Sequence, residues 1–525
     1  MVSGAALVGA LSLTPAPLKA QVTAFKQAVA EAASRDEALS AFYRENGFAP
    51  VWTVDTEAGI DRRSALLRAL RDADQHGLPV KRYQFEALLE QLGEADTPRE
   101  LGLAEVAMSK AFIIYARDVQ SGMFKPTSLD DGIKRDAPVR DPRENLESFL
   151  NSDPARFMHS LPPTTSQYLA LMKEKKRLET VIAQGGWGPT VKGNKIEPGD
   201  RGNAVISLRN RLIALGYLDR SPSAVYDTDM QKAVQAFQID NGLEPDGVAG
   251  AGTIKELNRT PQDRLKSIMV AMERERWLNK DRGDRHVLVN LTDFTARIVD
   301  HGTVTFETRS VVGKNQSDRR SPEFSDVMEH MVINPTWNVP RSIATKEYLP
   351  MLKRNPNAVS YLKLVNGRGQ VVNRGAVDFS QFSARNFPFD IKQPPGSRNA
   401  LGLVKFMFPN KHNIYLHDTP AKNLFAREVR AYSHGCIRLH QPFDFAYTIL
   451  AKQVEDPKEF FQSRLKTGRE TKVDLEQDIP VHIIYRTAFS DGKGHMNYRR
   501  DVYGRDAKIW QAMVNEGVAL DAVQG

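Results

Sequence analysis

Two short stretches, IYLHDTP at residues 414–420 and YSHGCIRL at residues 432–439, indicate the fold and the chemistry of this chain together. In the first, a run of apolar and aromatic residues ends on His417, which is typical of a histidine at the end of a strand. In the second, Cys436 follows a glycine and precedes Arg438 by two positions. A thiol becomes a nucleophile as its thiolate, so it needs an imidazole or a cation close by. The pattern therefore predicts a nucleophilic cysteine with a histidine partner.

Cys436 is the only cysteine of the chain. A single cysteine cannot form an intrachain disulfide or build a cysteine-rich zinc or iron–sulfur site. A lone cysteine is most often a small buried hydrophobic residue, but the neighbours of this one favour catalysis. Gly435 leaves space before the sulfur, so a carbonyl group can approach the backbone and the N–H groups of the turn can receive an oxyanion. No His-x-x-x-His spacing indicates a metal, and we expect neither a metal nor a cofactor.

Length and composition indicate a soluble protein of several domains. The chain has 525 residues, 41% hydrophobic and 26% charged, which excludes a membrane bundle or a disordered tail. The length suggests about three or four domains. Lys and Arg outnumber Asp and Glu by 72 to 64, a net charge of +8. This mild excess, without a long basic run, fits an anionic partner such as a cell-wall polymer or lipid head groups, and not nucleic acid.

The start of the chain resembles a secretory signal. Apolar residues fill 4–13, and a segment rich in small residues follows at 14–20, like the apolar core and cleavage end of such a signal. Only three residues precede the apolar run, so we interpret residues 1–20 as a truncated signal, or one whose true start lies upstream. No stretch reaches the roughly 18–20 apolar residues that span a bilayer.

Periodicity divides the rest of the chain. Residues 21–185 have helical spacing, and a linker rich in glycine, proline and lysine follows at 186–198. Residues 199–258 predict three short helices, the second capped by Asp227 or Thr228 and the third by Thr253. From about residue 286 the pattern alternates as in strands. We expect strands at 286–291, 296–299, 327–334, 402–408, 413–417 and 481–485, with an insertion at about 341–393.

The segment YSHGCIRL, with His417 in an upstream strand, resembles the signature of the L,D-transpeptidases of bacterial peptidoglycan. The resemblance continues through NPTWNVP at 334–340, NALG at 399–402 and DVYGRD at 501–506. The unit at 199–258 is similar to a peptidoglycan-binding domain. The N-terminal part, with FY at 42–43, PVW at 50–52 and GLP at 77–79, resembles the scaffold domain of the large Gram-negative branch.

The resemblance implies a multidomain α+β protein. It would have a helical scaffold domain at 21–185, a small three-helix peptidoglycan-binding domain at 199–258 and a mainly-β L,D-transpeptidase catalytic domain at 259–489. The insertion at 341–393 would be a partly helical lid, and residues 490–525 a C-terminal extension. By the same resemblance, Cys436 would attack a tetrapeptide stem at its diaminopimelate carbonyl, release D-alanine and form a thioester. An amine of a second stem would then make a 3-3 cross-link, with His417 carrying the proton, a task for which histidine has a suitable pKa.

Six further residues complete the predicted site. His434 shapes the turn or donates to the substrate, and Arg438 either lowers the thiol pKa, holds a stem carboxylate or forms a structural salt bridge. Tyr415 and Trp337 are expected to form pocket walls, with core packing as the alternative. Ser433 and Gly435 complete the turn as oxyanion or substrate contacts.

Two other functions compete with transpeptidation. A cysteine hydrolase of the wall, such as an L,D-carboxypeptidase, would use the same two residues with water as the acceptor, and a wall-binding protein would be inactive. The acceptor could be another stem, a free D-amino acid or an outer-membrane lipoprotein. The resemblance further implies a periplasmic, carbapenem-sensitive enzyme of wall biogenesis and cell shape, which we expect to be a monomer that binds glycan and stem peptides.

Overall fold

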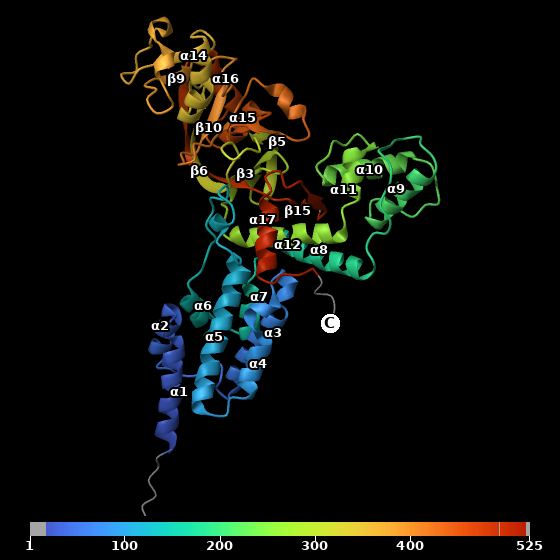
Figure 1. Cartoon of the computed structure of the whole chain (residues 1–525), viewed down its shortest axis with the longest axis vertical. Helices are drawn as coiled ribbons and strands as arrows, with labels where there is room; N and C mark the ends of the chain where they lie inside the picture. The colour runs from blue at the N-terminus through green and yellow to red at the C-terminus, as the bar shows by residue number, and fades with distance from the viewer. Residues whose placement is uncertain (1–16, 493, 521–525) are drawn as a thin grey trace, which may run out of the picture.

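The computed structural model describes residues 17–492 and 494–520. Figure 1 shows a helical part at the lower end of the molecule, a β-rich part at the upper end and a small helical unit to one side. Residues 1–16 of the expected signal lie outside the described residues. None of the helices within the described ranges is both long and apolar enough to cross a membrane.

The lower part is built from helices that begin at well-defined caps. Their bounds are α1 (Pro17–Ala33), α2 (Glu37–Glu45), α3 (Glu57–Arg71), α4 (Phe85–Gly93), α5 (Pro98–Ser121), α6 (Pro142–Leu150), α7 (Pro154–Ser160) and α8 (Ser166–Ala183). The long helix α5 starts with a capping box between Thr97 and Glu100, which satisfies two main-chain donors at once. This part confirms the predicted helical scaffold.

A buried carboxylate fixes the loop between α2 and α3 onto α5. Glu105 accepts hydrogen bonds from the N–H groups of Val51 (2.7 Å), Trp52 (3.0 Å) and Thr53 (2.9 Å). Its carboxylate also accepts one from the Tyr43 hydroxyl at 2.9 Å. Because each carboxylate oxygen has donors, the charge is tolerated inside the core. Phe42 and Tyr43 of the FY segment and Val51 and Trp52 of the PVW segment are therefore core residues, whereas Pro50 is exposed.

The side unit contains the three expected helices, α9 (Asn203–Ala214), α10 (Thr228–Asp240) and α11 (Ala251–Leu257). The strands β1 (Lys195–Ile196) and β2 (Ala249–Gly250) pair antiparallel beneath them. Asp227 caps α10, as predicted, by accepting from the N–H of Met230. The cap predicted at Thr253 is wrong: α11 begins earlier, and the buried Thr253 hydroxyl accepts from the Gln238 amide at 3.1 Å.

The β-rich part is a nine-stranded sheet in the order β12-β5-β13-β11-β10-β6-β14-β3-β4. Its strands are β3 (Arg285–Asn290), β4 (Thr295–Asp300), β5 (Thr303–Gly313), β6 (Phe324–Ile333), β10 (Val404–Met407), β11 (Leu416–His417), β12 (Ala431–Ser433), β13 (Ile437–Leu439) and β14 (Thr471–Ile484). Because β4 also pairs with β5, the sheet closes on itself. The helices α15 (Pro442–Leu450) and α16 (Pro457–Lys466) pack beside it. This confirms the mainly-β domain.

The insertion after β7 (Trp337–Asn338) is a small folded unit. It contains α13 (Arg341–Ile343), a π-helical turn, α14 (Leu349–Arg354), β8 (Lys363–Val365) and β9 (Asp390–Gln393). The strands form a separate sheet in the order β7-β9-β8. Buried side chains such as Leu352, Leu362 and Phe387 give the unit a core of its own. The insertion is thus more ordered than its polar sequence indicates.

The helical and β-rich parts share one boundary of packed helices and ion pairs. Helix α12 (Pro261–Trp277), which precedes β3, and helix α17 (Arg505–Asn515), after the hairpin β15 (Ala488–Ser490) and β16 (Met496–Tyr498), both pack in the scaffold core. Figure 1 shows α8, α12 and α17 between the two parts. The chain therefore enters the barrel only at β3, although the predicted catalytic domain begins at residue 259.

Candidate active site

Strands β11 and β13 place the two predicted catalytic residues side by side. The strands pair in parallel, with Leu416 opposite Ile437 and His417 opposite Arg438. The N–H of Ile437 donates to the carbonyl of Tyr415 at 3.1 Å. Cys436 therefore lies directly before β13, two positions before Arg438, which faces His417 at the end of β11. Cys436 and His417, 19 positions apart in sequence, are thus carried by neighbouring strands.

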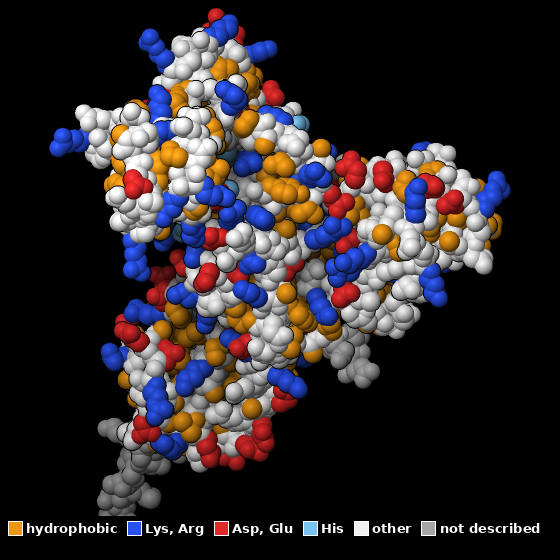
Figure 2. Space-filling model, turned by 45° about the horizontal axis from the view of Figure 1, so that its top comes forward, with side chains coloured by type: hydrophobic (Ala, Val, Ile, Leu, Met, Phe, Trp, Pro, Cys, Tyr) orange, Lys and Arg blue, Asp and Glu red, His pale blue; other side chains and the backbone are white. Residues whose placement is uncertain are grey.

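A cavity of about 410 Å³ opens at this point, between the barrel and the insertion. Seven of the eight predicted site residues line it, namely Trp337, Tyr415, His417, Ser433, His434, Cys436 and Arg438. Gly435 lies in the same turn without lining the cavity. On the face shown in Figure 2, Lys and Arg side chains are spread over all parts of the molecule, and Asp and Glu side chains form smaller groups at the lower end, in the middle and toward the right side.

Cys436 is half-buried, and its thiol donates to the Asn413 carbonyl at 3.4 Å. Burial raises the pKa of the thiol to about 11. The main chain and hydroxyl of Tyr415 and the guanidinium of Arg438 oppose this rise without cancelling it. Among the described residues no hydrogen bond joins the sulfur to His417. At neutral pH the free enzyme therefore holds a protonated thiol.

His417 is buried, with an exposed fraction of 4%. Its Nδ1 lies 2.5 Å from the carbonyl oxygen of Asp418, so Nδ1 carries the proton of the neutral ring and Nε2 is free to accept one. Burial and the positive charge of Arg438 lower the pKa of His417 to about 3, although the Asp418 and Leu401 carbonyls oppose this. Both shifts favour the neutral form, of the Cys436 thiol and of the His417 ring, in the free protein.

Hydrogen bonds hold the turn before the cysteine in a strained shape. Gly435 has φ of +117°, and a Cβ at this position would lie 3.2 Å from the Ile414 side chain, so glycine is required. Ser433 accepts from the Gly435 N–H at 3.1 Å and donates to the Cys436 carbonyl at 2.5 Å. The Gly435 N–H is thus occupied. The N–H of Cys436 has no partner among the described residues and is the better candidate for an oxyanion donor.

Arg438 faces the cavity as a cation without a counter-ion. Within residues 17–492 and 494–520 it forms no ion pair, and its buried Nε has no hydrogen-bond partner. Burial lowers its pKa, and the nearby Cys436 sulfur raises it again in part. The structural salt bridge considered from the sequence is absent from the described part of the chain. An unpaired guanidinium in a cavity is suited to an anionic group of a ligand.

Aromatic residues and the insertion close the cavity around the sulfur. Tyr415 is half-buried, with its ring centroid 5.6 Å from that of His417. Trp337 is buried in β7 and meets Tyr348 of the insertion edge-on at 6.3 Å. Both side chains are therefore pocket walls as well as packing residues.

Glu347 of the insertion is a site residue that the sequence did not indicate. Its carboxylate accepts from His434 Nε2 at 2.8 Å and pairs with Arg319 at 2.7 Å. His434 therefore joins the turn before Cys436 to the insertion. No local motif marks Glu347, because it lies 87 positions from His434 in an otherwise polar helix.

Ser321 and Tyr503 are a second group that sequence reasoning missed. Ser321 is fully buried and donates to the Gly435 carbonyl at 2.6 Å, while its oxygen accepts from the Gly313 N–H at 2.9 Å. The Tyr503 hydroxyl donates to the Gly313 carbonyl at 2.6 Å. Tyr503 of the DVYGRD segment thus supports the turn before Cys436 indirectly, through Gly313 and Ser321. The described residues contain no group of three His, Cys, Asp or Glu side chains that could hold a metal ion.

The raised thiol pKa makes a direct prediction for alkylation of the free enzyme. Since the pKa of Cys436 is about 11, the thiolate fraction, and hence the rate with iodoacetamide, should rise by roughly tenfold per pH unit between pH 7 and 9. Intact-protein mass spectrometry would follow the reaction, because the chain has a single cysteine. Arg438→Met should slow labelling further at each pH, since a cation that favours the thiolate is lost. N-acetylcysteine is the control, and a rate that levels off near pH 7 would contradict the neutral resting state.

Comparison with known proteins agrees with this geometry. Residues 284–475 match the family described as "L,D-transpeptidase catalytic domain", residues 37–174 match "Scaffold domain" and residues 201–257 match "Putative peptidoglycan binding domain". A curated relative from Haemophilus influenzae, named "Putative L,D-transpeptidase", is 28% identical over 305 residues. The match covers 57% of this chain and 60% of the relative.

Two solved L,D-transpeptidase structures are similar only in part. One, from Xylanimonas cellulosilytica, is 13% identical, with a TM-score of 0.17, over 57% of this chain and all of that one. Another, from Stackebrandtia nassauensis, is 16% identical, with a TM-score of 0.22, over 57% of this chain and 97% of that one. Superpositions this weak carry no argument about the fold. The family matches are more informative: residues 284–475 match an L,D-transpeptidase catalytic domain, and a scaffold domain and a peptidoglycan-binding domain are matched beside it.

Proposed function

We propose that this chain is a peptidoglycan L,D-transpeptidase in which Cys436 is the nucleophile and His417 carries the proton. The observation that carries the proposal is the placement of a neutral thiol and a neutral imidazole on adjacent strands of one cavity. A peptidoglycan-modifying acyltransferase is what the family matches indicate at the coarser level. The 3-3 specificity and the residue roles go beyond those matches.

In the acylation step the Cys436 sulfur attacks the carbonyl carbon of diaminopimelate at position three of a tetrapeptide stem. The thiol proton passes to His417 Nε2, and the oxyanion accepts a hydrogen bond from the main-chain N–H of Cys436. When the C–N bond breaks, His417 returns the proton to the leaving nitrogen of D-alanine. A thioester remains. The thiol must first leave the Asn413 carbonyl, so substrate binding and proton transfer are coupled.

In the second step an amine of diaminopimelate on another stem attacks the thioester carbon. His417 takes a proton from this amine and gives it to the departing sulfur, which restores the thiol and completes a 3-3 cross-link. Water in place of the amine would give the hydrolase. A free D-amino acid or a lipoprotein amine would give the other acceptors of the same chemistry.

Arg438 would bind a negative charge of the donor. Stem peptides carry carboxylates, and Arg438 is a cation in the cavity that no acidic side chain of the described residues neutralises. The same charge favours the thiolate that forms during attack. One residue can therefore serve both the binding and the activation considered from the sequence.

The peptidoglycan-binding domain would hold the enzyme on its polymer and raise the local concentration of stems. The net charge of +8 favours an anionic wall. A wall substrate places the enzyme outside the cytoplasm, and we propose the periplasm. The carbapenem sensitivity and the monomeric state expected from the sequence remain proposals of the same kind.

The decisive assay incubates the full chain with purified disaccharide-tetrapeptide and analyses the products by mass spectrometry. We expect D-alanine and 3-3 dimers from the unmodified enzyme and none from Cys436→Ala. His417→Gln should lose at least roughly a hundredfold in rate, the usual scale of a general base. His440→Gln, an exposed histidine outside the cavity, is the matched control and should be unaffected. Tripeptide alone would identify a hydrolase, and no turnover would identify a wall-binding protein; either outcome contradicts the proposal.

The insertion would act as a lid that excludes water from the thioester. Glu347 is its contact with the nucleophile's turn, through His434 and Arg319. Glu347→Ala should therefore raise the ratio of hydrolysis to transfer several-fold in the same assay, while Cys436 is still acylated. Asp390→Ala changes an exposed acidic residue of the same insertion outside the cavity and is the control. Equal ratios in the Glu347 variant and the unmodified enzyme would exclude the lid role.

A further inference from the structure

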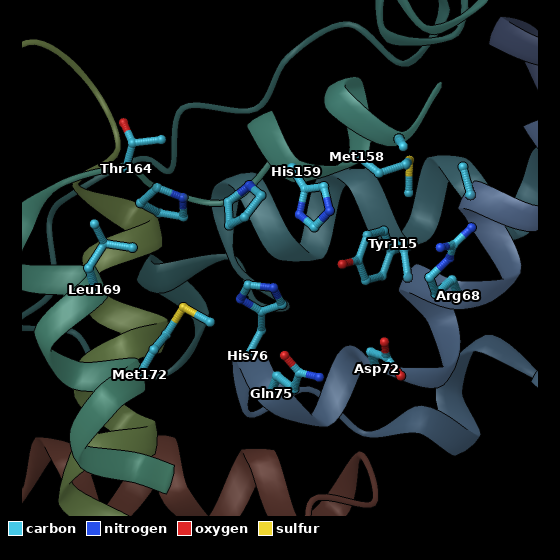
Figure 3. A pocket seen from close by; sticks show the side chains of 15 residues that line it. Arg68, Asp72, Gln75, His76, Tyr115, Met158, His159, Thr164, Leu169 and Met172 are labelled. Carbon is cyan, nitrogen blue, oxygen red and sulfur yellow. The ribbon is translucent and has the colours of Figure 1, made fainter. Parts of the chain in front are cut away.

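The scaffold domain contains a second cavity, remote from Cys436, that the proposed function does not use. It has a volume of about 300 Å³ and lies between α3, the turn at Ala73–His76, α5, α7 and α8. Figure 3 shows the side chains of His76, Tyr115 and His159 facing the same space, with Met158 and Met172 beside them. A concave site that combines apolar walls with a few convergent polar groups is the usual form of a small-molecule site.

Tyr115 is the first sign that this cavity is built for a ligand. Its side chain is buried, with an exposed fraction of 3%, in contact with Tyr83. Its hydroxyl points into the cavity in Figure 3, and no group among the described residues hydrogen-bonds it. The hydroxyl is open to the cavity, where a polar group of a bound molecule can replace water as its hydrogen-bond partner.

His76 offers a second group of defined character. The Tyr168 hydroxyl accepts from Arg276 Nε at 3.4 Å, so its own hydrogen is free to donate to His76 Nδ1 at 3.1 Å. Nδ1 then accepts, and the ring proton is on Nε2, a donor with no partner among the described residues. Burial, followed by the positive charges of Arg276 and Lys175, lowers the pKa of His76 to about 3, which favours the neutral ring.

The charges around the cavity favour an anion that also carries a donor. Arg68 lines it without an ion pair among the described residues, whereas Arg276, which donates to the His76 carbonyl, lies outside the lining and is paired with Glu273 at 2.6 Å. Asp72, at the C-terminal cap of α3, lines the cavity too and pairs with Arg71 at 2.9 Å. A phosphate would be repelled by Asp72 and would leave the apolar walls uncovered. A carboxylate that also carries an N–H group would pair with Arg68 and donate a hydrogen bond to Asp72.

The apolar wall of the cavity indicates the chemistry of the remaining part of the ligand. Met158 is buried, Met172 is half-buried, and Leu169 at the rim is 56% exposed. An aliphatic side chain placed against them would remove this surface from water. We infer that the scaffold cavity binds a small carboxylate with an N–H group and an aliphatic side chain, of the size of an amino acid or dipeptide end. The carboxylate meets Arg68, His76 and Tyr115, and the N–H faces Asp72.

Isothermal titration of the full chain with N-acetyl-leucine tests this assignment, and N-acetyl-leucinamide is the uncharged comparison. We expect binding of the acid on the order of millimolar or tighter and at least tenfold weaker binding of the amide. Tyr115→Phe removes only the hydroxyl, and Arg68→Met removes the charge; each should weaken the acid about fivefold or more. Arg117→Met, an exposed arginine of α5 outside the cavity, should change nothing. Thermal unfolding of each variant checks that the fold is retained.

Several outcomes would overturn the assignment. Equal affinity for acid and amide would reduce the site to an apolar cavity, and inorganic phosphate that binds more tightly than the acid would exclude the carboxylate. Binding that survives Tyr115→Phe and Arg68→Met but is lost in Arg438→Met would place the ligand in the catalytic cavity instead. Absence of binding when N-acetyl-leucine is present at 20-fold its expected dissociation constant would contradict a ligand role for Tyr115.

Discussion

A buried cluster of ion pairs at the scaffold–barrel boundary is the constraint on which the rest of the structure depends. Glu323 pairs with Arg274 at 2.8 Å and with Arg505 at 3.1 Å, and Arg505 also reaches Asp130 of the scaffold at 3.3 Å. Arg505 donates to the Ser321 carbonyl at 2.9 Å, and the Ser321 hydroxyl holds the Gly435 carbonyl. Loss of one partner from such a cluster costs about 3–5 kcal/mol, because it leaves a buried charge unpaired. The scaffold and the C-terminal helix are therefore part of what positions the nucleophile.

The electrostatics of the two cavities differ in a way that fits their different roles. In the cavity that contains Cys436, burial raises the pKa of the thiol and lowers the pKa of His417, which favours the neutral form of both groups. In the scaffold cavity burial likewise lowers the pKa of His76, which favours its neutral form, and burial raises the pKa of the neighbouring Tyr115 hydroxyl. The first arrangement suits proton transfer and the second suits binding.

Much of the fold and of the site could be predicted from the sequence, because the signals are local. Alternation predicted β3 and β4 to within a residue or two, and the glycine before Cys436 is needed for its positive φ. The sequence did not indicate the short strand β13, which pairs with β5, or the first ten residues of β14. In β14 the exposed polar stretch interrupts the alternating pattern. Glu347, Ser321 and Tyr503 could not be found, because their contacts join segments 87 to 190 positions apart. Tertiary packing, and not local pattern, gives these residues their roles.

The central claim is that Cys436 forms a covalent thioester with the donor while the fold holds its turn from behind. The most direct measurement is intact-protein mass spectrometry of the full chain, trapped seconds after mixing with a tetrapeptide donor and no acceptor, followed by peptide mapping. The account predicts one adduct, with a mass increase equal to the mass of the donor minus that of one D-alanine, on the peptide that contains Cys436. An adduct on another residue, or D-alanine release with no adduct at any time, would contradict it.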